Sequence, residues 1–311
     1  MRVLIYSAHR YPARTEIGAG FNPTDATSGA ASMVHDWLAK GLAELGHKVF
    51  YLLKEGTSVP PPPGVEFVSA PVPDVDVSHN LDLGSRPWVT TIHSFRPQSV
   101  PAPENWIFVS RTLAQSLGRS RFVLNGLDPA DYVYTEKKEE YYLFIGSMNK
   151  QREKGLAIAL QLSRDAGFPL VVAGTASDTL TIQTVAEMCR NAGASYVGDV
   201  RGARKTELIA GAKAVLFPTQ VPEAFGLVIA EALVSGTPVI TSDHGACPEL
   251  MSQEVGFVCK DPSDYLRAID RIGEISPQAC RAKAITDFHY KRMTLDYIRE
   301  YEAEISSGPG A

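Results

Sequence analysis

The sequence predicts an α/β protein built from two doubly wound parallel sheets. Short apolar runs of strand length alternate with helical segments along most of the chain. This alternation starts twice, once at residue 2 and again at residue 141. At 311 residues the chain is also long enough for about two domains. We therefore expect two Rossmann-like domains that face each other across a cleft.

The first domain is predicted over residues 1–135. It opens with the strand RVLIYS, and after the loop of residues 8–27 a helix and a second strand follow in SGAASMVHDWLAKGLAELGHKVFYLL. Further strands are predicted in VEFVSA, WVTTIHS, NWIFVS and RFVLNGL, with the short helix RTLAQSLG before the last of them. A loop as long as the first one is a candidate binding element.

The second domain is predicted over residues 136–285, after a charged linker near residues 134–140 that lacks periodic apolar positions. Strands and helices then alternate strictly, in the order YYLFIGS, GLAIALQLSRDAG, PLVVAGT, TIQTVAEMCRNAG, ASYVGDV, RKTELIAGA and AVLFPT. A last helix is predicted over residues 286–305. Its apolar residues favour a packing role. Their spacing does not decide which domain the helix packs on, and packing back onto the first domain is one possibility.

Composition excludes several classes of function. The chain is 44% hydrophobic and 21% charged, has a net charge of −5, and lacks a Lys/Arg block, which argues against a nucleic-acid partner. No apolar run approaches the roughly 18 residues of a transmembrane helix, so there is no strong membrane signal. The four cysteines show no metal-ligand spacing and favour reduced thiols in a cytoplasmic protein. No metal site is predicted.

The stretch PEAFGLVIAEAL places Glu223 and Glu231 around an apolar helix. Glu223 falls in the loop after the strand AVLF, at the carboxyl edge where open α/β sheets bind ligands. The helix is predicted to start near Phe225, so that Gly226 lies in its first turn. Free amides and the helix dipole make that turn a site for an anion. Glu231, at the far edge of this anion site, is predicted to accept hydrogen bonds from a ribose.

This spacing of two glutamates, followed by ALVSGTPVI, resembles the retaining GT-B glycosyltransferases, in particular their family four, the glycosyl transferases of group 1. The resemblance covers nearly the whole chain, and only the middle of the N-terminal domain is shortened. It extends to the first loop and helix (SGAASMVHDWLAKGLAELGHKV), the histidine strand (TTIHS), the linker entry (VLNGLD), the phosphate-clamp loop (LFIGSMNKQREKG), the base-binding strand (YVGDV) and the Gly-x-x-x-Glu turn (SDHGACPEL).

The resemblance implies a role for each matching residue. Lys154 would contact the donor pyrophosphate, and His93 and Glu223 would meet the donor sugar, which makes these three the candidate catalytic residues. The candidate donor-binding residues are Gly29, Arg152, Val197, Phe225, Gly226, Leu227 and Glu231. The family places an arginine where this chain has Ser147, and Arg152 or Lys150 is the expected substitute.

The activity implied is transfer of a sugar, typically a hexose, from a UDP, GDP or ADP sugar to a small-molecule, glycan or lipid-linked acceptor. Retention of configuration, independence of metals and the lack of any cofactor are part of this expectation. Two alternatives stay open. A nucleotide-sugar epimerase of the same fold would need further carboxylates that the pattern does not locate. A catalytically silent nucleotide-sugar binding protein is suggested by Ser147.

Overall fold

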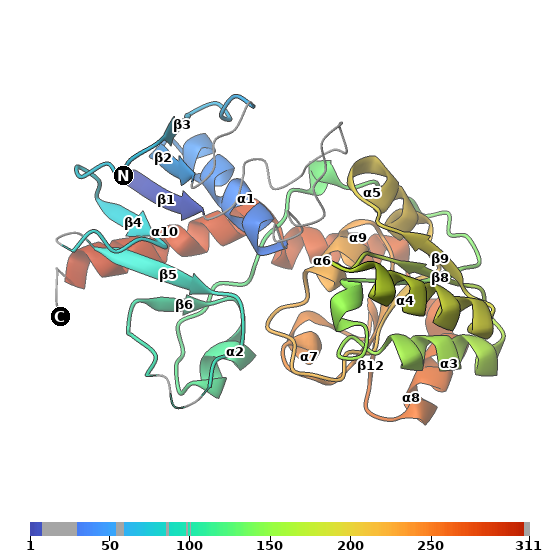
Figure 1. The fold of residues 1–311 in the computed structure, drawn as a ribbon. Helices are drawn as coiled ribbons and strands as arrows, with labels where there is room; N and C mark the ends of the chain where they lie inside the picture. The colour runs from blue at the N-terminus through green and yellow to red at the C-terminus, as the bar shows by residue number, and fades with distance from the viewer. Residues whose placement is uncertain (8–29, 54–58, 85–86, 98, 100, 308–311) are drawn as a thin grey trace. The chain divides into compact units, whose positions relative to one another are not determined.

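The chain folds around two separate parallel sheets, shown in Figure 1. The computed structural model describes residues 1–7, 30–53, 59–84, 87–97, 99 and 101–307. Its described residues divide into a first unit, which lies within residues 1–128 and 287–307, and a second unit, residues 129–286. The chain thus passes from one unit to the other after residue 128 and again after residue 286.

The first unit holds six strands in the order β3-β2-β1-β4-β5-β6, all parallel to their neighbours. Its elements are β1 (Arg2–Ser7), α1 (Ala30–Glu44), β2 (Lys48–Leu53), β3 (Val65–Val68), β4 (Val77–His79), β5 (Trp88–Ile92), β6 (Trp106–Phe108), α2 (Arg111–Ser116) and α10 (Tyr290–Ser307).

The two faces of this sheet are covered differently. Helix α1 packs along β1 and β2, and the Tyr51 hydroxyl donates to Asp36 Oδ1 of that helix at 2.7 Å. On the opposite face, Leu4 and Phe50 form a cluster with Val75, which lies in the loop between β3 and β4. A connection of a few apolar residues therefore covers strands that a helix covers in a larger doubly wound domain.

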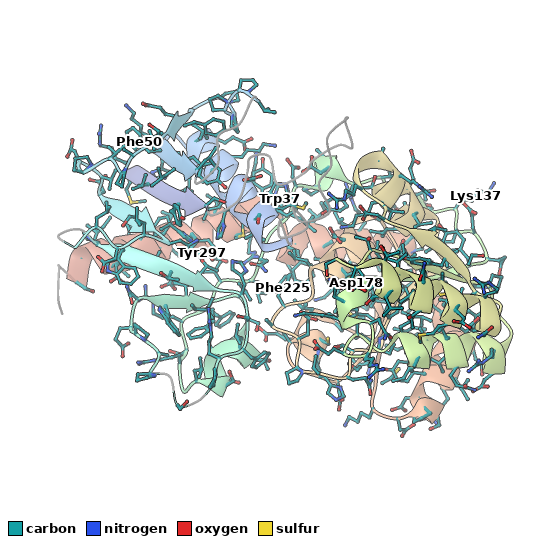
Figure 2. All side chains as sticks on the ribbon, in the orientation of Figure 1. Trp37, Phe50, Lys137, Asp178, Phe225 and Tyr297 are labelled. Atoms are coloured by element: carbon teal, nitrogen blue, oxygen red, sulfur yellow. The ribbon has the colours of Figure 1, made fainter. Side chains whose placement is uncertain are left out.

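Helix α10 completes the first unit from the other end of the chain. It lies along α1, β4 and β5 in Figure 1, and the Tyr290 hydroxyl donates to Glu44 Oε2 at 2.7 Å. Tyr297, labelled in Figure 2, and Tyr301 are fully enclosed against the sheet. The last predicted helix is thus part of the core of the unit that contains the N-terminus.

The second unit holds six parallel strands in the order β12-β11-β10-β7-β8-β9. Its strands are β7 (Tyr142–Ile145), β8 (Leu170–Ala173), β9 (Ser195–Gly198), β10 (Ala214–Phe217), β11 (Val239–Ser242) and β12 (Gly256–Cys259). Its helices are α3 (Leu156–Ala166), α4 (Thr179–Ala192), α5 (Gly202–Gly211), α6 (Leu227–Val234), α7 (Cys247–Leu250), α8 (Pro262–Arg271) and α9 (Pro277–Asp287), with 3-10 turns at Pro129–Asp131, Met148–Lys150 and Ile272–Glu274.

Both faces of the second sheet are buried. Leu216 of β10 belongs to the core shared with α3, α4 and α8, while its neighbours Val215 and Phe217 point to the other face and are buried as well. Helix α6 contacts α5, β10 and β11 on that other face. A parallel sheet with helices on both faces needs such continuous apolar strands, and AVLF is one of them. The predicted class, two Rossmann-like α/β domains, is confirmed.

Three details differ from the sequence-based expectation. The segment RFVLNGL, predicted as a strand, makes only two isolated parallel bridges, between Phe122 and Phe108 and between Leu127 and His289. Strand β4, at the centre of the first sheet, was not predicted, because only three residues form it and polar residues flank them. Helix α6 begins at Leu227, two residues after its predicted start.

In each sheet the direction of strand addition reverses at one point, between β1 and β4 in the first unit and between β7 and β10 in the second. Loops that leave the carboxyl ends of two such strands diverge and leave a crevice, which is where open α/β sheets bind ligands. The loops after β7 and β10 carry Lys154 and Glu223. The reversal in the second sheet therefore sets the place of the candidate site.

Candidate active site

Loops from three neighbouring strands build the candidate site of the second unit. β7, β10 and β11 lie side by side and run parallel, so the loops that follow them leave the same edge of the sheet. Backbone contacts tie the first two loops together: Gln220 N donates to the Glu153 carbonyl at 2.6 Å, and Thr219 Oγ1 donates to the same oxygen at 3.2 Å. Lys154 and Glu223 are thereby brought to one place.

The backbone of Glu223 is fixed by the loop after β11. Glu223 forms a parallel bridge with Gly245, and Ala246 N donates to the Glu223 carbonyl at 2.8 Å. Gly245 has a φ of +64°, and a Cβ at this position would lie 2.3 Å from Glu223 N and 2.4 Å from Glu223 O. The SDHGACPEL segment thus holds the glutamate in position by a backbone contact that only glycine permits.

Lys154 and Glu223 form an ion pair between Nζ and Oε2. Their side chains are 22% and 16% exposed, so the pair is shielded from water more than a typical surface pair. The ammonium also lies 5.2 Å from the centre of the Phe217 ring, where a cation is attracted to the ring face. Glu223 Oε1 accepts no hydrogen bond from the described residues. The pair therefore combines a held cation with a carboxylate oxygen that is free to accept.

Gly226 precedes the first residue of α6 in a left-handed conformation, with a φ of +93°. The sequence predicted it inside the first turn, but it occupies the N-cap position, and no side chain caps the helix. A Cβ here would lie 3.4 Å from Glu223 Cγ. Phe225 is buried, whereas Leu227 is half-buried; Figure 2 labels Phe225 in this loop. The start of α6 is thus adjacent to the Lys154–Glu223 pair and open to an anion.

Glu231 lies inside α6 with only 4% of its surface exposed. Its Oε1 accepts from Lys205 Nζ at 2.6 Å and from the Tyr132 hydroxyl at 3.0 Å, while Oε2 accepts no hydrogen bond from the described residues. Sequence reasoning missed both partners, because nothing in the patterns around Lys205 and Tyr132 links them to α6. They hold the carboxylate and leave one oxygen for a ligand.

The remaining predicted donor residues of the second unit are Val197 and the two cations expected to replace the arginine missing at Ser147, Arg152 and Lys150. Val197 is half-buried in β9, the edge strand of the sheet. Ser147 and Lys150 are exposed around the 3-10 turn after β7, and Arg152 is exposed in the loop that leads to Lys154. The side chains of Arg152 and Lys150 make no hydrogen bond or ion pair with described residues. Both cations are therefore available to an incoming anion.

In the first unit His93 follows directly after β5 and packs edge-on against His35, with ring centres 5.4 Å apart. Its Nε2 is buried and lacks a hydrogen-bond partner among the described residues. Burial lowers the pKa of His93 to about 4, so the ring is neutral at neutral pH. A neutral imidazole can both donate to and accept from a sugar hydroxyl.

Two residues that sequence reasoning left without a role support His93. Asn80, at the end of β4, is the only non-glycine residue with a positive φ in the described ranges, at +62°. Its Oδ1 accepts from Thr91 N at 3.0 Å, which fixes the amide so that Nδ2 faces His35 Nε2, also at 3.0 Å. Since Nδ2 only donates, His35 Nε2 accepts, and the neutral ring carries its proton on Nδ1.

His79 lies behind this group and is completely buried. Its Nδ1 contacts the Tyr301 hydroxyl at 2.6 Å, and its Nε2 contacts Thr91 Oγ1 at 2.8 Å. Burial, followed by the charge of a protonated His93, lowers the pKa of His79 to about 3. The imidazole thus joins β4, β5 and α10 in its neutral form.

Some predictions fall outside what the structure tests. Gly29 and the loop of residues 8–27, predicted as a binding element, lie outside the described residues. Within the described ranges no group of three His, Cys, Asp or Glu side chains could hold a metal ion. Two nearby aspartates of the first unit contact Arg2: Asp76 Oδ2 accepts from Arg2 N at 2.7 Å, and the Asp74 carbonyl accepts from Arg2 Nε at 2.6 Å. No helix of the described part of the chain has the length and apolarity needed to cross a membrane.

Gly245→Ala is expected to lower the free energy of unfolding of the second unit by about 2–4 kcal/mol, because the left-handed backbone and the approach to Glu223 both exclude a methyl group. Gly273→Ala is the matched control, since a Cβ there meets nothing within 4 Å and its φ is not in the left-handed range. Chemical denaturation of both variants measures the difference. Equal midpoints would show that the Glu223–Gly245 contact is not tight.

The sequence of the second unit matches a known family of proteins. Residues 133–285 match the family described as Glycosyl transferases group 1. Among curated proteins, the chain is 26% identical over 261 residues to the D-rhamnosyltransferase WbpZ of Pseudomonas aeruginosa, an alignment that spans 72% of this chain and 68% of the relative. The matched family segment contains all the candidate residues of the second unit.

Solved structures extend the likeness to the whole chain. AviGT4, a glycosyltransferase involved in avilamycin A biosynthesis, superposes with a TM-score of 0.79 and 26% identity over 99% of this chain and 98% of its own. Anabaena HepE in complex with UDP and glucose superposes with a TM-score of 0.71 over 97% of this chain and 100% of its own, and at 15% identity it shows the fold alone. The predicted resemblance to GT-B glycosyltransferases is confirmed. Residues 133–285 thus match the glycosyl transferases of group 1, and the chain is a glycosyltransferase with the GT-B fold.

Proposed function

We propose that this glycosyltransferase moves a hexose from a nucleoside diphosphate sugar to an acceptor, with retention of configuration and without a metal ion. The observation that carries the proposal is the Lys154–Glu223 pair beside the uncapped start of α6, at the reversal point of the second sheet. A cation and free helix amides suit a diphosphate. A carboxylate with a free oxygen suits sugar hydroxyls.

The chemistry is departure of the nucleoside diphosphate from the anomeric carbon. Negative charge grows on the leaving phosphate as the glycosidic bond breaks, and Lys154 together with the amides of Phe225, Gly226 and Leu227 would stabilise it. In this mechanism no side chain serves as the general base. The leaving phosphate itself takes the acceptor proton on the same face of the sugar, which gives retention.

Several residues would recognise the remaining parts of the donor. Oε2 of Glu231 would accept from the ribose, since Lys205 and Tyr132 occupy only Oε1. Val197 would lie against the base, and Arg152 or Lys150 would supply the second cation that Ser147 cannot. HepE binds UDP and glucose, and WbpZ transfers a D-rhamnosyl group, so a hexose or deoxyhexose on a nucleoside diphosphate is the donor class that we propose.

As the resemblance implies, we propose that His93 meets the donor sugar and that Gly29 also contacts the donor. His93 would act as a neutral hydrogen-bonding group, because its lowered pKa keeps it uncharged at neutral pH. We place the reaction in the cytoplasm, which fits the four free cysteines, Cys189, Cys247, Cys259 and Cys280. The acceptor class, a small molecule, glycan or lipid-linked sugar, stays open.

A thermal-shift panel of UDP, GDP and ADP tests the donor site. A ligand present at 100 times its dissociation constant stabilises the folded state by about 2.7 kcal/mol, which corresponds to about 5–10 °C for a domain of this size. We expect one of the three to raise the Tm by that amount and the matching nucleoside to leave it unchanged. If none of the three shifts the Tm, the donor site is wrong.

Turnover of the sugar nucleotide that carries the selected base then distinguishes the alternatives. Release of nucleoside diphosphate, lost in Lys154→Ala and Glu223→Ala, supports the transferase. Conversion of the sugar without release of diphosphate supports an epimerase. Binding without any turnover supports a silent binding protein, the possibility that Ser147 raises.

A further inference from the structure

The Lys154–Glu223 ion pair places a fixed negative charge where the proposed function puts the donor diphosphate. We propose that Glu223 makes the site select sugar nucleotides over bare nucleoside diphosphates, and that it thereby favours release of the product. This inference rests on the proposed donor site. It assigns to the carboxylate a second task besides contact with the sugar.

Before a donor binds, the two charges neutralise each other. Lys154 Nζ contacts Glu223 Oε2, and both side chains are mostly shielded from water. A diphosphate that recruits Lys154 must weaken this contact. It also brings its own negative charge close to the carboxylate, and like charges at such short range repel strongly in a partly dry site. A bare diphosphate therefore gains Lys154 as its partner, but it leaves the shielded Glu223 carboxylate without one, and this cost weakens its binding.

A sugar on the diphosphate changes this balance. Glu223 Oε1 accepts no hydrogen bond from the described residues, and Oε2 becomes available when Lys154 turns to the phosphate. Sugar hydroxyls are donors that can satisfy both oxygens, and hydrogen bonds to a carboxylate are stronger than those between neutral groups. The sugar thus replaces the lysine as the partner of Glu223. Binding of the sugar and binding of the diphosphate become coupled through one ion pair.

The same coupling acts on the product. Once the sugar has been transferred, its hydroxyls no longer satisfy Glu223, while the diphosphate carries the additional negative charge of the broken bond. Two anions, the diphosphate and the Glu223 carboxylate, then compete for Lys154, and the carboxylate cannot leave the site because it belongs to the chain. Return of the lysine to Glu223 favours departure of the nucleoside diphosphate, a step that limits turnover in many enzymes.

The structure allows the carboxylate charge to be removed without moving its surroundings. The Glu223 backbone is held by Gly245 and Ala246, whose contacts do not involve the side chain. Lys154 keeps its place over the Phe217 ring and its backbone bond to the Lys150 carbonyl at 2.8 Å. Glu223→Gln should therefore leave an ammonium at the same site with no anion to oppose a phosphate.

Glu153→Gln is the matched control. Glu153 is adjacent to Lys154, is exposed, and forms no side-chain ion pair or hydrogen bond with described residues. The substitution makes the same change in net charge without removing the partner of Lys154. Differences between the two variants then report the ion pair and not the charge of the whole protein.

Isothermal titration calorimetry tests the inference by measuring the affinity for inorganic pyrophosphate, for UDP, GDP and ADP, and for UDP-glucose and GDP-mannose. We expect Glu223→Gln to bind pyrophosphate and the preferred nucleoside diphosphate about tenfold more tightly than the wild type, a gain of about 1.4 kcal/mol. Binding of the matching sugar nucleotide should weaken or stay equal. Glu153→Gln should lie within about twofold of the wild type for each probe, as expected of an exposed charge.

Glu223→Ala provides a second variant without the carboxylate and should show the same gain. Wild-type protein that binds a nucleoside diphosphate as tightly as both variants would overturn the inference and leave the donor site intact. Absence of binding of every probe to wild type and variants would overturn the proposed function and this inference with it. Circular dichroism and the Tm confirm that the variants fold.

Discussion

Lys154→Met is expected to lower kcat for sugar transfer by about 100-fold or more, because removal of one group that stabilises charge in a transition state typically costs a factor of about 10²–10³. Methionine keeps most of the length of the lysine and removes only its charge. The substitution should lower kcat far more than it changes KM, since the phosphate charge that Lys154 meets grows as the bond to the sugar breaks. Initial rates with the sugar nucleotide selected by the thermal-shift panel measure it.

Two further variants separate the causes of such a loss. Lys154→Met leaves Glu223 without its partner, so the double variant Lys154→Met/Glu223→Gln tests whether an unpaired carboxylate is responsible. Lys213→Met removes an ion pair with Glu140 at 2.7 Å on the surface and should change kcat by less than about twofold. Activity of Lys154→Met within about threefold of the wild type would contradict the assigned role.

Acidification is expected to unfold the first unit selectively. His79 and His93 have pKa values lowered to about 3 and about 4 in the folded state, against 6.5 as the ordinary value. Above pH 6.5 both rings are neutral in the folded and the unfolded chain, and their contribution is fully present. Below it the unfolded chain binds protons that the folded unit does not. Each histidine then costs about 1.4 kcal/mol of stability per pH unit, or about 6 kcal/mol for the two by pH 4.

Tryptophan fluorescence follows this transition in the first unit alone, because Trp37, Trp88 and Trp106 are the three tryptophans of the chain and all lie in it. Urea unfolding between pH 7 and pH 4.5 gives the free energy at each pH. In His79→Asn the slope should fall by about 1.4 kcal/mol per pH unit, since one of the two groups no longer titrates. An unchanged slope would mean that His79 is protonated in the folded state.

Regular alternation made most of the fold predictable. AVLF and RVLIYS are continuous apolar runs because parallel strands are buried on both faces, and the structure contains both of them as strands. β4 was not predicted because its three residues have no strand pattern of their own. They form a strand by pairing with β1 on one side and β5 on the other. The strand expected in RFVLNGL did not form, because its apolar residues are present but make only two isolated bridges, Phe122 with Phe108 of β6 and Leu127 with His289 outside any strand.

The candidate site was predictable where one loop carries it and not where distant segments meet. Glu223 and Gly226 are close in sequence, and their order after a strand predicts a ligand site. That Lys154 pairs with Glu223 follows from the adjacency of β7 and β10, which no local pattern encodes. Asn80 and His35 belong to the same class, because their bond joins α1 to the end of a strand that was not predicted.

The return of the chain to the first unit affects how the protein is made. Strands β1–β6 leave the ribosome early, but α10, which supplies Tyr297 and Tyr301 to His79 and Thr91, is synthesised after the whole second unit. The described residues of the second unit, 129–286, are continuous in sequence, so their core can form as soon as they emerge. During synthesis the later unit should therefore reach its native state first, and the earlier one should wait with an uncovered apolar face, the species most in need of a chaperone.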